Sequence, residues 1–171
     1  MMKISIIVPV YNEEKTVAQV LKRLNETKIE NVEYEIIAIN DGSTDSSKDL
    51  LEKNKNYFTT LIHNERNSGK GFSVREGIKV ATGEYIIFQD ADLEYDPIEF
   101  KKFIKVCNDF DADVVIGSRF NYSEYTRSHN ILNKIGNKII TLTFNIIYNT
   151  TFTDVYSCYL CYKRKLVDPN K

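Results

Sequence analysis

The sequence predicts an α/β fold in which helices flank a mostly parallel β-sheet. Apolar runs rich in β-branched residues alternate with segments whose apolar residues recur at helical spacing. Polar clusters also follow the expected strands, at 9–13, 40–45, 90–94 and 117–120. Because ligands bind beyond the carboxyl ends of the strands in such sheets, we expect these clusters to share one functional edge.

Each element of the first half is bounded by a recognisable signal. Pro9 closes the first apolar run, and the turn Asn40-Asp41-Gly42 closes the second. Residues 43–45 supply N-cap candidates for a helix. In order, we expect a strand at 3–8, a helix at 13–25, a strand at 34–39, a helix from 43–45 to about 54, and a strand at 59–63.

The second half continues the same alternation. Thr82-Gly83 ends a helix, and Asp96-Pro97 opens another, with an N-cap followed by proline at the first helical position. We expect a helix at 69–81, a strand at 84–89, a helix from 97 to about 108, a strand at 113–117, an irregular loop at 118–130, a helix at 131–148 and a final strand at 153–162.

Composition narrows the class of protein. The chain has 171 residues, 42% hydrophobic and 27% charged, which predicts one globular domain over 1–171. A net charge of −1 argues against a nucleic-acid binder. Residues 119–171 carry 8 basic and 3 acidic side chains, against 15 and 21 in 1–118. This bias indicates either a surface that meets an anionic phosphate or lipid head group, or ordinary solvated lysines.

No targeting or redox signal stands out. The apolar run 4–10 is too short for a secretory signal, and no stretch is long enough to cross a membrane, so the expected compartment is the cytoplasm. Three cysteines are too few for a disulfide scaffold. Cys158 and Cys161 form a CxxC within a strand-like segment, which favours packed, unreactive thiols over a redox or zinc role.

The sharpest chemical feature is Asp90-Ala91-Asp92, directly after a buried strand. Two carboxylates at this spacing suit Mg²⁺ or Mn²⁺, and Glu94 offers a third oxygen. Such a metal would neutralise a departing diphosphate. The alternative is a pair of solvated turn aspartates.

Several other side chains suit a nucleotide ligand. The carboxylate of Asp41 can bind ribose hydroxyls or a base edge, and Gly42 lets the backbone bend close to a ligand; the alternative is a plain turn with a helix cap at 43–45. Lys70, at a helix start, suits a diphosphate or a base. Arg119 and Arg127 flank a loop and suit phosphate oxygens, or are surface charges.

The ordered set of motifs resembles glycosyltransferase family 2, and within it the polyprenyl-phosphate (dolichyl-phosphate) mannose and glucose synthases. The motifs are Pro9-Val-Tyr-Asn-Glu13, Asn40-Asp-Gly-Ser-Thr-Asp45, Asn67-Ser-Gly-Lys-Gly71, Gln89-Asp-Ala-Asp-Leu-Glu-Tyr-Asp-Pro97, Gly117-Ser-Arg-Phe120, Gly136-Asn137, Asn145 and Thr153-Asp154 to Cys158.

This resemblance implies a GT-A fold and an inverting transfer from a GDP- or UDP-sugar. It implies metal ligands at Asp90, Asp92 and Glu94, and catalytic roles for Asp92, Arg119 and Asp154. The positions that match substrate-binding segments are Pro9, Tyr11, Asn12, Glu13, Asp41, Lys70, Gln89, Asp90, Ala91, Arg119 and Arg127.

The acceptor stays open between two chemistries. A polyprenyl phosphate is already anionic and needs no base, whereas a saccharide hydroxyl needs a carboxylate such as Asp154. Asp154 otherwise orients a loop. The apolar helix 131–148, with Lys134 and Lys138, is either a peripheral membrane contact that favours the lipid or a core helix.

Two alternative functions stay open, and the chain departs from the family pattern in its length. A nucleotide-sugar binding module would bind without turnover. A nucleotidyltransferase would need a Gly-rich loop where this chain has Pro9-Val-Tyr-Asn. Relatives usually continue past 154–158, so this chain is either shortened or a minimal form. A shortened chain would lack acceptor contacts or expose an apolar face that drives formation of a homodimer.

Overall fold

The computed structural model of the protein describes residues 1–118, 131–155 and 157–168. The chain divides into two compact units, which we call the sheet unit and the α5 unit. The sheet unit contains Met1–Val115 and Cys161–Lys171, and the α5 unit contains Ile116–Leu160.

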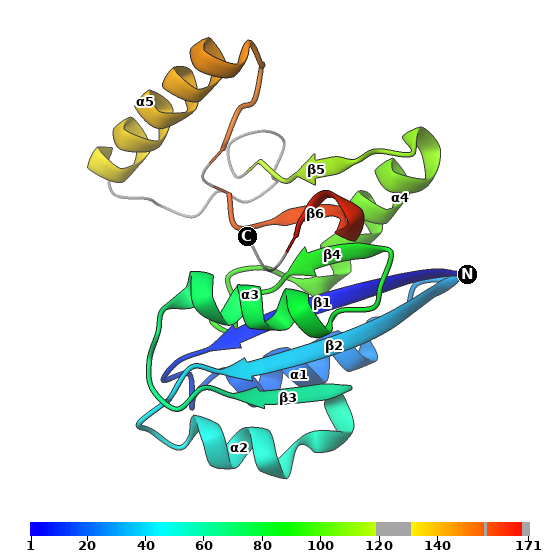
Figure 1. Cartoon of the computed structure of the whole chain (residues 1–171), viewed down its shortest axis with the longest axis vertical. Coiled ribbons are helices and arrows are strands. Elements are labelled where there is room, and N and C mark those ends of the chain that lie inside the picture. The colour runs from blue at the N-terminus through cyan, green and yellow to red at the C-terminus, as the bar shows by residue number, and fades with distance from the viewer. Residues whose placement is uncertain (119–130, 156, 169–171) are drawn as a thin grey trace. The chain divides into compact units, whose positions relative to one another are not determined.

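The described residues contain one six-stranded sheet, and its order is β3-β2-β1-β4-β6-β5 (Figure 1). The strands are β1 Met2–Val10, β2 Val32–Asn40, β3 Thr60–His63, β4 Tyr85–Phe88, β5 Val114–Ile116 and β6 Leu160–Lys163. β1 pairs in parallel with β2 and β4, β2 pairs in parallel with β3, and β6 is antiparallel to β4. The prediction of a mostly parallel sheet is confirmed.

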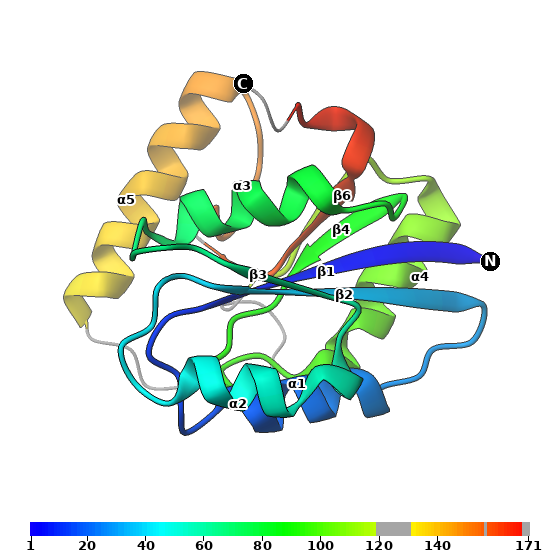
Figure 2. The ribbon, with the colours of Figure 1, turned by 60° about the horizontal axis from the view of Figure 1, so that its bottom comes forward.

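The helices of the sheet unit cover both faces of this sheet. They are α1 Val17–Glu26, α2 Ser47–Lys53, α3 Lys70–Val80 and α4 Phe100–Phe110. Figure 2 shows α1 and α2 on one face and α3 on the opposite face. Because both faces are covered, the central strands are apolar without alternation, and Ile6, Ile7 and Val8 are all fully buried.

The helix starts lie close to the predicted ones, but the N-cap of α2 is Ser46 rather than a residue of 43–45, and its side chain makes no capping hydrogen bond. The first helix begins at Val17 rather than residue 13, and it buries Val17, Val20, Leu21 and Leu24 as its spacing predicts. The Asp96 side chain accepts a hydrogen bond from Ile98 N at 3.0 Å. The turn that follows, Pro97–Glu99, is a 3₁₀ turn before α4.

A buried carboxylate ties the sheet to the turn after α3. Glu35 accepts hydrogen bonds from the Ser5 hydroxyl and from the Thr82 backbone N–H, the latter at 2.7 Å. Burial would raise the pKa of Glu35, but these hydrogen bonds and the nearby charge of Lys3 lower it below the usual value. The charge is therefore retained where a lone buried carboxylate would be destabilising.

In the α5 unit, α5 spans Ile131–Tyr148, the predicted range. Its buried side chains include the polar Asn137 and Thr141, whereas many of its apolar side chains are exposed. None of the helices in the described residues is both long and apolar enough to cross a membrane. The exposed apolar residues of α5 include Leu132, Ile139, Leu142, Ile146 and Ile147.

The final strand is shorter than predicted. We expected it at 153–162, but β6 begins at Leu160. Backbone groups of Phe152 and Val155, before β6, form hydrogen bonds with side chains of α5 instead. The Asn145 side chain pairs with both the N–H and the C=O of Phe152, at 3.0 and 2.8 Å, and Thr141 Oγ1 accepts from Val155 N at 3.3 Å. Backbone groups satisfied in this way have no need of a strand partner.

The CxxC prediction is wrong about local structure. Cys158 precedes β6 and is half-buried, and only Cys161 lies in the strand, fully buried. Cys161 Sγ lies 3.8 Å from Sγ of the buried Cys107 on α4, and all three cysteines are free thiols.

Candidate active site

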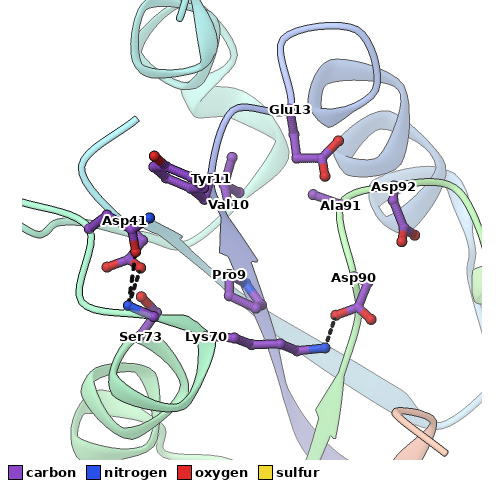
Figure 3. Close-up of a pocket in the computed structure, with 12 residues that line it drawn as sticks. Pro9, Val10, Tyr11, Glu13, Asp41, Lys70, Ser73, Asp90, Ala91 and Asp92 are labelled. Atoms are coloured by element: carbon purple, nitrogen blue, oxygen red, sulfur yellow. Dashed lines mark hydrogen bonds and ion pairs between the residues drawn. The ribbon is translucent and has the colours of Figure 1, made fainter. Parts of the chain in front are cut away.

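A pocket of about 390 Å³ lies where β1, β2 and β4 end (Figure 3). All of its lining residues belong to the sheet unit. The polar clusters after these strands therefore meet at one edge, as expected for the carboxyl ends of parallel strands. Of the predicted residues, Pro9, Tyr11, Glu13, Asp41, Lys70, Asp90, Ala91 and Asp92 line it, together with Val10, Asn67, Gly69 and Ser73.

Asp41 is buried and accepts hydrogen bonds from the loop before α3. Its Oδ1 accepts from Asn64 Nδ2 at 2.7 Å and from Ser68 N at 3.1 Å, and its Oδ2 accepts from Gly69 N at 2.8 Å. Burial would raise the pKa of Asp41, but hydrogen bonds from this loop and from Ser73 lower it below the usual value. The carboxylate therefore stays charged and fixes the loop that leads into α3.

Two glycines permit this close approach. Gly42 has φ +63°, and a Cβ there would lie 2.5 Å from the carbonyl carbon of Arg66. Gly69 has φ +88°, a conformation that L-residues rarely adopt. Both positions therefore favour glycine, Gly42 because of the adjacent backbone as well as its φ.

Lys70 reaches from the first residue of α3 to the end of β4. Its Nζ lies 2.5 Å from Asp90 Oδ1 (Figure 3). The Lys70 side chain is 47% exposed and that of Asp90 is 18% exposed. The structure thus places a cation directly on the first carboxylate of the predicted metal motif.

The rest of this motif forms a tight turn. Asp92 Oδ1 accepts from Glu94 N at 2.9 Å, and Leu93 between them has φ +65°. Asp92 lines the pocket, but Glu94 does not. Over the described ranges, no three His, Cys, Asp or Glu side chains gather closely enough to hold a metal ion. The predicted trio of Asp90, Asp92 and Glu94 is therefore not assembled in this structure.

Gln89 lies beneath the turn rather than in the pocket lining. It is fully buried, and its Nε2 donates to the carbonyls of Asp90 and Tyr95, both at 3.1 Å. These bonds clamp the two ends of the motif. Its Oε1 is buried and has no hydrogen-bond partner among the described residues.

The end of β1 is tied to the segment after β2. Asn12 has φ +54°, which asparagine tolerates, and its Oδ1 accepts from Thr44 N at 2.8 Å. The backbone N–H of Glu13 donates to the Ser47 hydroxyl at 2.8 Å. Asn12 therefore holds the loop, whereas Glu13 lines the pocket.

Three predicted residues lie elsewhere in the chain. Arg119 and Arg127 fall outside the described residues. Asp154 belongs to the α5 unit, where it is buried and accepts from Asn137 Nδ2 at 2.8 Å.

The sequence reasoning missed Asn64, which bonds to both Asp41 and Ser73, and the pocket residue Ser73 itself. Ser73 lies three residues after Lys70, so helical spacing offered a signal for it. Asn64 offered none, because its role depends on a partner 23 residues away.

Chemically, the pocket combines the carboxylates of Asp90 and Asp92 with the ammonium of Lys70. Oxygen donors of this kind suit hard divalent cations, and an ammonium suits phosphate oxygens. The hydroxyl of Ser73 and the loop 67–69 add polar groups at the start of α3.

Two curated relatives match nearly the whole chain. The chain is 32% identical over 172 residues to undecaprenyl-phosphate 4-deoxy-4-formamido-L-arabinose transferases of Photorhabdus laumondii and of Proteus mirabilis. Each match covers 97% of this chain and 50% of the relative, so this chain spans about half the length of these curated relatives.

Solved structures share the fold. Staphylococcus aureus TarS 1-349 in complex with UDP-GlcNAc superposes with a TM-score of 0.70 at 26% identity, covering 99% of this chain and 47% of TarS 1-349. Glucosyl-3-phosphoglycerate synthase of Mycobacterium tuberculosis, in complex with Mn²⁺, UDP and glucosyl-3-phosphoglycerate, gives a TM-score of 0.73 at 17% identity, covering 96% of this chain and 58% of that one. The protein has the GT-A fold of these transferases.

The family profile described as Glycosyl transferase family 2 matches residues 5–168, nearly the whole chain. The chain therefore belongs to glycosyl transferase family 2.

Proposed function

We propose that the protein is a glycosyltransferase that takes a sugar from a nucleoside-diphosphate sugar bound in the pocket of Figure 3. The observation that carries the proposal is the meeting of Asp41, Lys70, Asp90 and Asp92 at one sheet edge. The likeness to TarS, which was solved with UDP-GlcNAc, supports a nucleotide sugar as donor. The acceptor oxygen attacks the anomeric carbon from the face opposite the leaving diphosphate, so the configuration inverts.

Asp90 and Asp92 are the residues that would hold Mg²⁺ or Mn²⁺, with oxygens of the diphosphate completing the ligand set. The carboxylate oxygens fit a cation, since the ammonium of Lys70 already forms an ion pair with Asp90 Oδ1. A divalent cation here would neutralise charge on the leaving diphosphate. Asp41 and Glu13 stay as proposed contacts to the nucleoside. Asn12 holds the segment after Asp41 through Thr44 N, and Gln89 holds the turn that carries Asp90 and Asp92.

We propose a polyprenyl phosphate as the acceptor. Two relatives that match 97% of the chain are named undecaprenyl-phosphate transferases. Lys134 and Lys138 lie exposed on α5 beside exposed apolar side chains, a combination that suits a lipid with an anionic head. Peripheral membrane contact belongs to this proposal, and a homodimer stays a prediction.

A saccharide or polyol hydroxyl is the second candidate. It is favoured by a match of 42% identity over 94 residues to the poly(ribitol-phosphate) β-glucosyltransferase of Bacillus spizizenii, covering 53% of this chain and 15% of that one. A hydroxyl must lose a proton, and Asp154 is the proposed base. Asp154→Asn should then reduce transfer to a hydroxyl about 10²–10⁴-fold, but transfer to a lipid phosphate far less.

The donor site is tested by calorimetric titration with UDP and GDP, each with and without Mn²⁺. We expect one nucleotide to bind tightly only with metal, and Asp92→Asn to abolish the metal-dependent part. Asp109→Asn on α4, which is not a lining residue of the pocket, is the matched control and should bind like the wild type. Equal nucleotide binding with and without Mn²⁺ would refute the metal assignment. Binding without transfer to any acceptor would favour a non-catalytic binding module.

A further inference from the structure

The ion pair between Lys70 and Asp90 crosses the candidate donor pocket. It joins the first residue of α3 to the residue two positions after β4, with 2.5 Å between Nζ and Oδ1. Both residues line the pocket, as the dashed contact in Figure 3 shows. The same carboxylate that suits a divalent cation is therefore already neutralised by an internal one.

The position of Lys70 is unfavourable for its own helix. A cation at a helix N-terminus opposes the helix dipole, and α3 has no acidic residue in its first turn to offset it. The backbone before it is fixed by Gly69 N, which donates to Asp41 Oδ2 at 2.8 Å. Helix stability therefore does not explain why an ammonium lies at the start of α3. The side chain of Lys70 points toward Asp90 instead.

A divalent cation on Asp90 would lie close to the Lys70 ammonium, and like charges at such short range repel each other. Lys70 therefore competes with a second cation for this carboxylate. Because Lys70 lines the pocket, the oxygens of a diphosphate bound there would offer its ammonium an alternative partner. An anion in the pocket should consequently free the metal-binding carboxylate.

We propose that Lys70 is an internal counter-ion that occupies Asp90 until a nucleoside diphosphate draws it away, so that diphosphate and divalent cation bind cooperatively. This inference rests on the proposed function of the pocket. In this role the ammonium of Lys70 exchanges its contact with Asp90 for one with the diphosphate when the donor binds. It also makes a metal alone a weak ligand, which would keep the site closed to cations when no donor is present.

The test compares Lys70→Met with wild type in Mn²⁺ titrations followed by the electron paramagnetic resonance signal of free Mn²⁺. Without nucleotide, the variant should bind Mn²⁺ about three- to tenfold tighter, as expected when a partly exposed ion pair no longer competes. UDP binding in the presence of Mn²⁺ should weaken by about tenfold, because one phosphate contact is lost. The enhancement of Mn²⁺ affinity by UDP should shrink accordingly. GDP replaces UDP in these titrations if GDP is the preferred nucleotide.

Two further variants serve as controls. Lys79→Met removes another lysine of α3, whose Nζ lies 2.6 Å from Glu76, outside the pocket lining. It should leave both affinities unchanged. Lys70→Arg keeps a positive charge at the same position and should keep Mn²⁺ affinity within about twofold of wild type. Circular dichroism establishes that each variant is folded.

Opposite shifts for metal and nucleotide separate this role from a structural one, which would weaken both. Equal or weaker Mn²⁺ binding by Lys70→Met overturns the inference, and so does an absence of Mn²⁺ binding by both proteins. If no nucleotide binds to wild type under any condition, the proposed function fails instead. In that case, tighter Mn²⁺ binding by the variant still supports Lys70 as the counter-ion of Asp90.

Discussion

Replacing Asp41 by asparagine isolates the energetic role of a single carboxylate. Asp41 receives N–H groups from Asn64, Ser68 and Gly69, at 2.7, 3.1 and 2.8 Å. An asparagine that keeps the Oδ1 contacts points its NH₂ group at the N–H of Gly69, which leaves a buried donor facing a donor. Losing one hydrogen bond to a charged acceptor and weakening the others costs about 2–4 kcal/mol.

The assay is urea unfolding followed by far-ultraviolet circular dichroism. With a slope of about 2 kcal/mol per molar urea, Asp41→Asn should lower the midpoint by about 1–2 M at pH 7. Asp109→Asn is the control, because Asp109 pairs with Lys105 on the surface of α4, and its effect should stay within about 0.5 kcal/mol.

The dependence on pH gives a second, independent check. Because folding lowers the pKa of Asp41, its stabilisation is fully present above the unfolded pKa of about 3.9 and is lost as the pH falls through the folded pKa. The gap between wild type and Asp41→Asn should therefore be constant from pH 7 to 5 and narrow below pH 4. A midpoint shift under about 0.3 M at pH 7, or a gap that widens in acid, would refute the reasoning.

Three further perturbations test other parts of the molecule. Gly42→Ala should cost about 2–4 kcal/mol in urea unfolding, because its Cβ would lie 2.5 Å from backbone at φ +63°, whereas Gly71→Ala, with open space around it, should be neutral or stabilising by up to about 1 kcal/mol. Glu35→Gln should lower stability by about 1–3 kcal/mol near pH 7, and the effect should fade below pH 4 because folding lowers the Glu35 pKa. Asn137→Leu removes the 2.8 Å hydrogen bond to buried Asp154, so the free energy of unfolding should fall by about 1–3 kcal/mol and the thermal midpoint should drop; an unchanged midpoint would contradict this prediction.

Structural elements whose boundaries are set by residues close in sequence could be predicted from the sequence. The helix at 131–148 matches α5 residue for residue, because its apolar run ends at a clear boundary. The cap at Asp96 also forms as expected, with its side chain on Ile98 N. In each case the deciding interactions span a few positions, so a local pattern carries the information.

The features that depend on distant partners were not predictable in detail. The segment before β6 is apolar enough for a strand, yet Asn145 and Thr141 on α5 capture its backbone. Asp41 was expected at the nucleoside, and its bonds to a loop 23 to 28 residues away have no local signature. The sequence predicted that Lys70 and Asp90 lie at one edge of the sheet, but it did not predict the ion pair between them.

The acidic residues at this edge therefore differ in a way that bears on function. Asp41 is committed to backbone and amide donors that cannot leave without disturbing the loop, so it acts as a fixed part of the pocket wall. Within the described residues, the Asp90 carboxylate instead pairs with the flexible, half-exposed side chain of Lys70, a contact that can be lost at little cost to the fold. In the proposed counter-ion role, Asp41 fixes the loop that leads into the helix of Lys70, and Asp90 exchanges Lys70 for a divalent cation when a diphosphate binds.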